Sequence, residues 1–230
     1  MWRACAKVPH FMRPISIAGR FPVSVLAALA IGGIASLPSA ALSQELQQLQ
    51  EISRAGEKAI LARPGLEMTG ARNPDLTIVE YFDYNCPFCK QVVPTFKQLL
   101  SEDKKLAIVY KDWPVLGESS AYAARCALAA GWQDKYFIAH DALLSGPRLS
   151  RNDQIETILR GAGVDLDKLK KDLAAHAGEI TALLARNDAE AHALDLDGTP
   201  GILVGRQLMP GGADVDFFRK LIAAVRSGPK

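Results

Sequence analysis

Cys86 and Cys89, separated by two residues, are the side chains of this sequence best suited to chemistry. They follow a run of β-branched and aromatic residues and begin a segment with helical spacing. Cysteines three apart on a first helical turn can form a disulfide, because bridged Cα atoms lie roughly 4.4–6.8 Å apart. The unpaired N–H groups of a helix N-terminus also favour a thiolate. The spacing therefore predicts a redox pair in which an exposed Cys86 attacks and a shielded Cys89 resolves the mixed disulfide.

A zinc site and a static structural disulfide are the alternatives for such a pair. The sequence has no second Cys-x-x-Cys, and His140, His176 and His192 lie far from the pair along the chain, which argues against zinc. A disulfide that closes so short a loop stabilises a fold little. Soft thiolates also bind monovalent copper, so a copper-binding protein is the competing class, although no cluster of Met and His surrounds the pair. Disulfide exchange itself calls for no cofactor.

Glu80 is the third residue that we expect to take part. On the strand predicted over residues 76–84 it points to the same face as Ile78 and Phe82. If that strand is central, the carboxyl is buried near the thiols, where it can hold or relay a proton and where desolvation raises its pKa. The alternative is a glutamate at the border of the sheet that reaches water. Lys111, at the end of the next strand, is expected to approach the same region.

Residues 1–41 have the layout of a secretory signal peptide. Basic residues without any acid precede an apolar run over 21–37, and small residues follow at 39–41. An uncleaved membrane anchor is the alternative, because the run is near the lower length limit for a span. Export to the periplasm would leave three cysteines in an oxidising compartment. Cys126, the odd one, lies in an alanine-rich helix and is expected to be buried and inert.

Hydrophobic periodicity predicts the elements that position these side chains. The first half is predicted to hold a strand over 76–84, a helix over 87–100 and a second strand over 106–111. After a helical block, two short strands follow over 201–204 and 207–209, and a last helix covers 214–225. Residues 65–75 are predicted to be a connector. This order describes an α/β domain over 65–117 and 195–230, interrupted by an all-helical insertion over 118–194.

The segment 42–64 is predicted to form an N-terminal helical arm. Aliphatic residues recur over 42–62 at spacings of four and three, which is typical of an amphipathic helix. Two interpretations stay open for this helix: it joins copies of the chain into a homo-oligomer, or it packs on its own domain.

The composition excludes few classes of protein, but the charge bears on whether nucleic acid is a binding partner. Hydrophobic residues make up 49% of the chain and charged residues 23%, which is ordinary for a globular protein. The net charge of +2 arises in residues 1–41, which hold four of the 27 basic residues and no acidic one, so 23 basic residues face 25 acidic ones in the remainder. So mild a charge gives no reason to expect nucleic acid as a partner.

The segment YFDYNCPFCK at 81–90, followed by a helical block and then GTPGILVG at 198–205, resembles the DsbA-like thioredoxin superfamily, and in particular its exported ScsC-type members. The resemblance extends from about residue 64 to the C-terminus. It implies a thioredoxin fold with an inserted helical domain, with Cys86 as the nucleophile, Cys89 as the resolving cysteine and Glu80 as the buried acid. It also implies cysteine-containing exported proteins as substrates and a redox partner at the membrane that resets the pair.

The same resemblance assigns substrate-binding roles to Pro200, Thr199 and Phe88. Pro200 matches a cis-proline that faces the disulfide, although few X–Pro bonds are cis and the sequence alone favours trans. Thr199 matches the residue whose backbone pairs with an extended substrate. Phe88 stands where the strongest oxidants have histidine, and because phenylalanine cannot stabilise a thiolate by hydrogen bonding, a less extreme oxidant is expected. Thr199 and Gly201 differ from the oxidants, which leaves the direction of electron flow open.

Overall fold

The computed structural model describes residues 49–62 and 67–228. The predicted signal peptide and residues 42–48 of the predicted arm lie outside the described residues. The described elements, in chain order, are β1 (Gln50–Glu51), α2 (Arg54–Leu61), β2 (Glu67–Gly70), β3 (Leu76–Phe82), α3 (Pro87–Glu102), β4 (Leu106–Asp112), α4 (Glu118–Ala130), the 3₁₀ turn η1 (Gly131–Gln133), α5 (Tyr136–Ser145), α6 (Asn152–Gly161), α7 (Leu166–Ala175), α8 (Ala177–Ala193), β5 (Gly201–Val204), β6 (Gln207–Pro210) and α9 (Val215–Ser227). None of these helices is both long and apolar enough to cross a membrane.

The six described strands form one mixed sheet in the order β1-β6-β5-β3-β4-β2. β3 is central: it pairs in parallel with β4 and antiparallel with β5. All but one of its residues are buried, as expected for a strand covered on both faces. The prediction of a central, buried strand leading into the cysteine pair is therefore confirmed.

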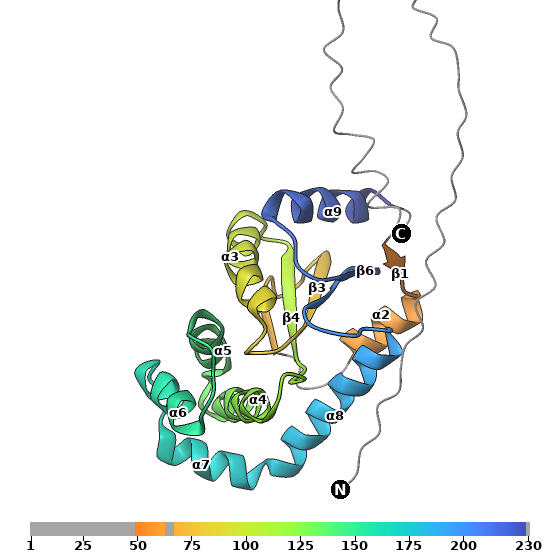
Figure 1. Ribbon diagram of the computed structural model, residues 1–230. Coiled ribbons are helices and arrows are strands. Elements are labelled where there is room, and N and C mark those ends of the chain that lie inside the picture. The colour runs from red at the N-terminus through yellow and green to blue at the C-terminus, as the bar shows by residue number, and fades with distance from the viewer. Residues whose placement is uncertain (1–48, 63–66, 229–230) are drawn as a thin grey trace, which may run out of the picture. The chain divides into compact units, whose positions relative to one another are not determined.

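Helices cover both faces of the sheet (Figure 1). On one face, α3 and α9 pack through Phe96 and Phe218, whose rings meet edge to face at 5.5 Å, over β-strand residues such as Ile78 and Ile202. On the other face, α2 and the end of α8 cover Val79 and neighbouring residues. Alternate residues of β3 thus belong to different cores, and Glu80 lies on the face of the sheet that α3 covers.

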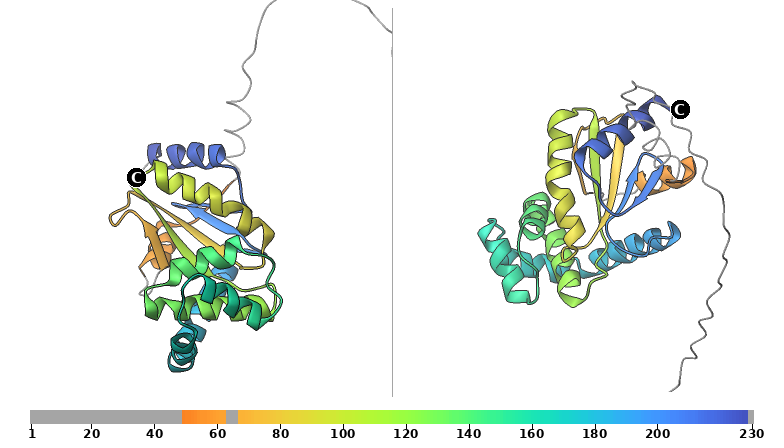
Figure 2. Two further views of the ribbon diagram at one scale, coloured as in Figure 1. Left: turned by 90° about the vertical axis from the view of Figure 1, so that its left-hand side faces the viewer. Right: turned by 45° about the horizontal axis from the view of Figure 1, so that its top comes forward.

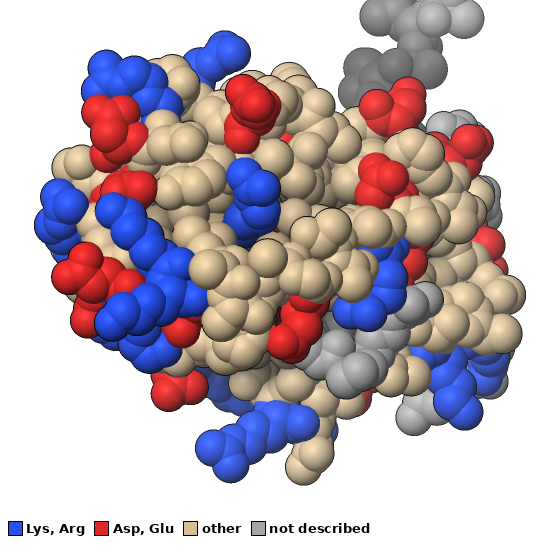
Figure 3. Space-filling model, turned by 90° about the horizontal axis from the view of Figure 1, so that it is seen from below, with Lys and Arg blue, Asp and Glu red and all other residues tan. Residues whose placement is uncertain are grey.

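Between β4 and β5 all the elements are helical, and the views in Figure 2 place α4 to α7 beyond one end of the sheet. These helices share a core with the end of β3 and the start of α3, including Phe82, Tyr84, Cys86 and Cys89. Seen from below, acidic and basic side chains are interspersed on the surface (Figure 3). The cysteine pair therefore lies where the sheet meets the helical segment.

The continuous helix predicted over residues 42–62 is wrong in its described part. Gln50 and Glu51 pair with β6 instead, and the buried Ile52 donates its backbone N–H to the carbonyl of Arg206 at 2.9 Å. The helix begins only at Arg54, because the Ser53 side chain caps it by accepting a hydrogen bond from the Gly56 N–H. From residue 49 onward the arm therefore packs on its own domain.

The connector predicted over residues 65–75 contains a strand. β2, over Glu67–Gly70, pairs antiparallel with β4 and forms one edge of the sheet. Its residues alternate between partly buried and exposed positions, but a strand of four residues with a Gly gives little periodic signal. Gly70 adopts a φ of 102°, and a side chain there would collide with the carbonyl of Leu106. That close approach requires glycine at the end of the edge strand.

Candidate functional site

Cys86 and Cys89 lie at the junction of β3 and α3. Cys86 is the N-cap of α3, and Pro87 occupies the first helical position, where its missing N–H costs nothing. The backbone N–H of Cys89 lies 3.4 Å from Cys86 Sγ, as in other side-chain caps of helix N-termini. Both thiols are free, and Cys89 has no exposed surface. Cys86, expected to be exposed, is only 3% exposed, so that prediction is wrong.

The environments of the two thiols displace their pKa values in opposite directions. Hydrogen bonds from the Cys89 side chain, from Thr199 and from the backbone N–H groups of Phe88 and Cys89 outweigh desolvation and lower the pKa of Cys86 from 9.0 to about 6. Burial, with the hydrogen bond to Cys86 and the charge of Glu80, raises the pKa of Cys89 far above its usual range. Near neutral pH, Cys86 is therefore the thiolate and Cys89 the thiol.

The loop before β5 closes over Cys86. The Thr199–Pro200 peptide bond is cis, as the resemblance implied, and Cys86 Sγ lies 3.1 Å from the carbonyl oxygen of Thr199. This contact and the core that Cys86 shares with the helical segment both bury its side chain. Gly201 follows because a side chain there would collide with Leu196. Phe88, by contrast, is 59% exposed on the first turn of α3 and adds apolar surface beside the pair.

Glu80 is buried on the face of the sheet that α3 covers, as predicted, and is 2% exposed. Desolvation, with a smaller contribution from the charge of Cys86, raises its pKa to about 8. Its Oε1 accepts no hydrogen bond from any described residue. The carboxyl lines a cavity of about 150 Å³ together with Tyr110 and His140, which is room for several water molecules.

Lys111 does not approach this region, contrary to the prediction. In the strand register it pairs with Tyr81, one position beyond Glu80, so it points to the opposite face of the sheet. There its Nζ lies 3.0 Å from Glu190 Oε2 of α8 and 3.4 Å from the carbonyl of Ile60. Lys111 therefore belongs to the contact of α2 and α8 with the sheet.

Cys126 lies within α4 and has no exposed surface. Desolvation raises the pKa of its thiol to about 12, although a hydrogen bond from Tyr122 opposes the shift. The prediction of a buried cysteine is therefore confirmed, and its lack of reactivity stays a prediction, which burial and a raised pKa both favour. In the described residues, no group of three or more His, Cys, Asp or Glu side chains is arranged to hold a metal ion.

Sequence reasoning missed the polar side chains that hold the cysteine loop. Asp83 and Asn85, just before Cys86, bind the start of α4, and Asn85 also binds the loop after α5. Lys90 donates to the carbonyls of Leu143, Leu144 and Gly146 at 3.0–3.1 Å at the end of α5. Nothing in the local pattern marks these residues, because their partners are distant in sequence. A larger cavity of about 710 Å³, lined in part by Trp132, Phe137 and Arg186, contains none of the predicted site residues.

Comparison with known proteins places this geometry in context. Residues 77–223 match the family described as the DSBA-like thioredoxin domain. A thioredoxin-like oxidoreductase from Silicibacter pomeroyi is 33% identical, with a TM-score of 0.72 over 77% of this chain and 100% of that one. The thiol-disulfide exchange protein α-DsbA2 from Wolbachia pipientis is 26% identical, with a TM-score of 0.68 over 80% of this chain and 96% of that one. The predicted thioredoxin fold with a helical insertion is confirmed.

A structure of Proteus mirabilis ScsC, 24% identical, has a TM-score of 0.61 over 80% of this chain and 82% of that one, and so shares the fold. The curated relatives that the chain matches are Na⁺/H⁺ antiporters. One from Salinispora arenicola is 26% identical over 163 residues, which are 70% of this chain and 25% of the antiporter. The chain thus spans about a quarter of the length of these relatives, and the match concerns that portion alone.

Proposed function

Because the chain belongs to the family of DSBA-like thioredoxin domains and carries the Cys86–Cys89 pair of a thiol-disulfide oxidoreductase, we propose that it exchanges disulfides with exported proteins. The observation that carries this proposal is the placement of the two sulfurs: Cys86 caps α3 with the Cys89 N–H 3.4 Å from its sulfur, whereas the Cys89 thiol has no exposed surface. These surroundings lower the pKa of Cys86 to about 6 and raise that of Cys89 far above its usual range. One sulfur is thus prepared to attack or leave, and the other is held back until a mixed disulfide exists.

In the oxidising direction, a substrate thiolate attacks the sulfur of Cys86 in the Cys86–Cys89 disulfide. The sulfur–sulfur bond of the pair breaks, the electron pair goes to Cys89, and a mixed disulfide joins Cys86 to the substrate. A second substrate thiolate then attacks the substrate sulfur and displaces Cys86 as a thiolate. The substrate thereby loses two electrons to the pair, and the reverse sequence reduces a substrate disulfide.

Glu80 serves in this proposal as the acid that supplies the proton. Cys89 leaves as a thiolate in a buried position, where its raised pKa makes protonation favourable. A carboxyl with a pKa near 8 is largely protonated at neutral pH and can give up that proton. The cavity beside Glu80 has room for water molecules that can return this proton to the carboxyl. Thr199 and Pro200 supply backbone for an extended substrate segment, and Phe88 supplies an apolar contact.

The signal-peptide layout of residues 1–41 supports export to the periplasm, an oxidising compartment in which disulfide exchange has substrates. The substrates would be exported proteins that contain cysteine, and a membrane redox partner would reset the pair. The experiment that tests location expresses the full chain in a bacterium, separates periplasm from cytoplasm, and sequences the mature N-terminus. Recovery in the periplasm with a new N-terminus near residue 42 is expected. Retention of residues 1–41 in the membrane fraction would establish an anchor instead.

The catalytic proposal is tested by exchange with a model protein disulfide. Cys86→Ser should abolish turnover, and Cys89→Ser should accumulate a substrate joined to Cys86 that reductant releases on a non-reducing gel. Cys126→Ser is the matched control, because that thiol is buried and distant in sequence, and it should exchange at the wild-type rate. Normal turnover in Cys86→Ser would rule out the proposal.

The direction of exchange is decided by the reduction potential of the pair, measured by equilibration with glutathione. A potential between roughly −120 and −180 mV, the range from DsbA to protein disulfide isomerase, would support disulfide donation or shuffling. A potential near roughly −270 mV, that of thioredoxin, would make the protein a reductase that needs an electron supply.

A further inference from the structure

Asp83 is a buried acidic residue at the end of β3, with 1% of its surface exposed. Its carboxylate accepts three hydrogen bonds, all from uncharged donors. Oδ1 accepts from the Asn85 N–H and the Ser120 hydroxyl, both at 2.7 Å, and Oδ2 accepts from the Leu116 N–H at 2.8 Å. Lys90 adds an electrostatic interaction through space. A buried carboxylate held by neutral donors keeps much of its field, so groups close to it respond to its charge.

Two of these donors flank the first residue of α4. Leu116 precedes Glu118 and Ser120 follows it, while the N-cap position is Gly117, which has no side chain to cap the helix. The N-terminus of a helix carries partial positive charge and attracts anions. Asp83, the residue after β3, thus places a buried carboxylate beside a helix start that has no side-chain cap of its own.

The thiol of Cys86 belongs to the same turn of chain as this carboxylate. The Cys86 N–H donates to the carbonyl of Asp83 at 3.1 Å, which closes a four-residue turn over 83–86. The ends of such a turn lie within about 7 Å of each other at their Cα atoms. The turn thus brings the backbone of Asp83 next to that of Cys86, and a negative charge in the neighbourhood of a thiol opposes its ionisation.

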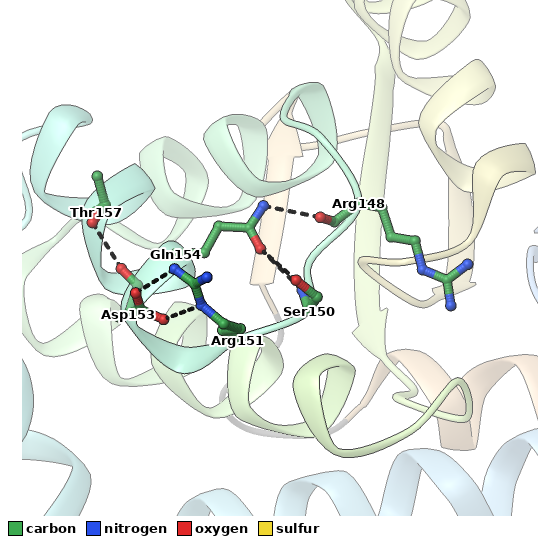
Figure 4. Close-up of polar contacts among 6 residues, drawn as sticks. All are labelled: Arg148, Ser150, Arg151, Asp153, Gln154 and Thr157. Carbon is green, nitrogen blue, oxygen red and sulfur yellow. Dashed lines mark hydrogen bonds and ion pairs between the residues drawn. The ribbon is translucent and has the colours of Figure 1, made fainter.

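Asn85, inside the turn, ties it to the helical segment. Its amide donates to Ser119 Oγ, Ser120 Oγ and the Leu149 carbonyl at 3.0–3.1 Å, and its Oδ1 accepts from the Leu149 N–H at 2.7 Å. The residues on either side of Leu149 are held by Gln154, which donates to the Arg148 carbonyl and accepts from the Ser150 N–H (Figure 4). The turn that carries Cys86 is therefore fixed to two parts of the helical segment.

We propose that Asp83 is a positioning residue that fastens the Cys86 turn to the start of α4 and, through its charge, moderates the thiolate and the oxidising strength of the pair. This proposal deepens the proposed exchange activity and rests on it. It adds that the helical segment does more than cover the cysteines. The contact between α4 and Asp83 adjusts how readily Cys86 ionises, in addition to the larger effect of the Cys89 hydrogen bond.

The test is Asp83→Asn, which keeps the shape and removes the charge. The Cys86 pKa, followed by thiolate absorbance at 240 nm in the reduced protein, should fall by about 0.5–1 unit. The equilibrium with glutathione should shift roughly three- to tenfold toward the reduced protein, because a more stable thiolate stabilises that form. Glu118→Gln is the matched control: it removes an acidic charge from the same helix end at an exposed position, where solvent screens it, and should leave both values unchanged.

Ser120→Ala separates the effect of the Asp83 charge from the effect of a weaker attachment between the Cys86 turn and α4. This variant keeps the carboxylate but removes one of its donors, so the Cys86 pKa should rise or hold while that of Asp83→Asn falls. A purely structural role would move both variants in the same direction, and that result would overturn the proposal, as would an unchanged Cys86 pKa in folded Asp83→Asn. If Asp83→Asn does not fold, a lowered Cys86 pKa in Ser120→Ala overturns it. Because these titrations use no substrate, they test the role of Asp83 independently of whether the protein exchanges disulfides.

Discussion

The sulfur of Cys86 lies 3.1 Å from the backbone carbonyl oxygen of Thr199, the residue that precedes the cis-proline. Two segments more than a hundred residues apart therefore meet at the reactive atom. The carbonyl accepts a hydrogen bond from the neutral thiol, whereas the Thr199 side chain lowers the pKa of Cys86 by hydrogen bonding to the thiolate. This single residue thus contacts both protonation states.

Replacing the Thr199 hydroxyl by a methyl group should make Cys86 less acidic. In Thr199→Val we expect the Cys86 pKa to rise from about 6 by roughly 0.5–1 unit, because one hydrogen bond to the thiolate is lost. Iodoacetamide alkylation rates of the reduced protein across pH 4–9 measure this value. Thr199→Ser keeps a hydroxyl and serves as the control, which should titrate like the wild type. Equal titration of the Val and Ser variants would contradict the role given to the hydroxyl.

The hydrogen bond from Cys89 is the largest influence on the Cys86 pKa. In Cys89→Ala, which has no donor, that pKa should rise by about 1–2 units. Cys89→Ser retains a hydroxyl donor in the same place and should keep most of the acidity. Thiolate absorbance followed against pH gives the Cys86 pKa of each variant. A low pKa preserved in Cys89→Ala would mean that the backbone N–H groups of α3 suffice alone.

The chemistry of the pair could be predicted from local sequence, because the helix that activates Cys86 is encoded by its immediate neighbours. Pro87 at the first helical position and the apolar β3 before it fix the junction without reference to the remaining chain. The same alternation correctly placed Glu80 on the buried face. Local pattern was enough wherever the partner of a residue lay within the same element.

Predictions failed where the partner was distant along the chain. The strand register, which sends Lys111 to Glu190, and the loop that brings Thr199 over Cys86 are products of tertiary packing. Gln50 and Glu51 pair with β6 although their sequence favours helix, because an edge of the sheet offers them hydrogen bonds. Propensity over so short a segment is a weak preference that such contacts override.

Glu80 should make the oxidised protein less stable as pH rises. With both thiols free its pKa of about 8 exceeds its ordinary value of 4.5, and desolvation, the larger cause, acts in the oxidised protein as well, so the folded state holds a proton that the unfolded state releases. The associated stability is fully present below pH 4.5 and is lost as pH rises to about 8. Relative to wild type, Glu80→Gln should gain stability across that interval, by at least about 2 kcal/mol at pH 9. Urea unfolding of the oxidised proteins at pH 4 and 9 tests this, and an equal difference at both pH values would contradict it.

Lys90 should contribute more to stability than another lysine of the same helix. Its ammonium group donates to three carbonyls at the C-terminus of α5, where a cation is favoured. Lys90→Met should therefore lower the free energy of unfolding by about 2–3 kcal/mol, since those acceptors lose a charged donor. Lys97, two turns along α3, pairs with Asp141 of the same α5 but is 58% exposed, so Lys97→Met should cost under about 1 kcal/mol. Urea titration of both variants measures the difference, and equal losses would show that Lys90 acts only as a surface charge.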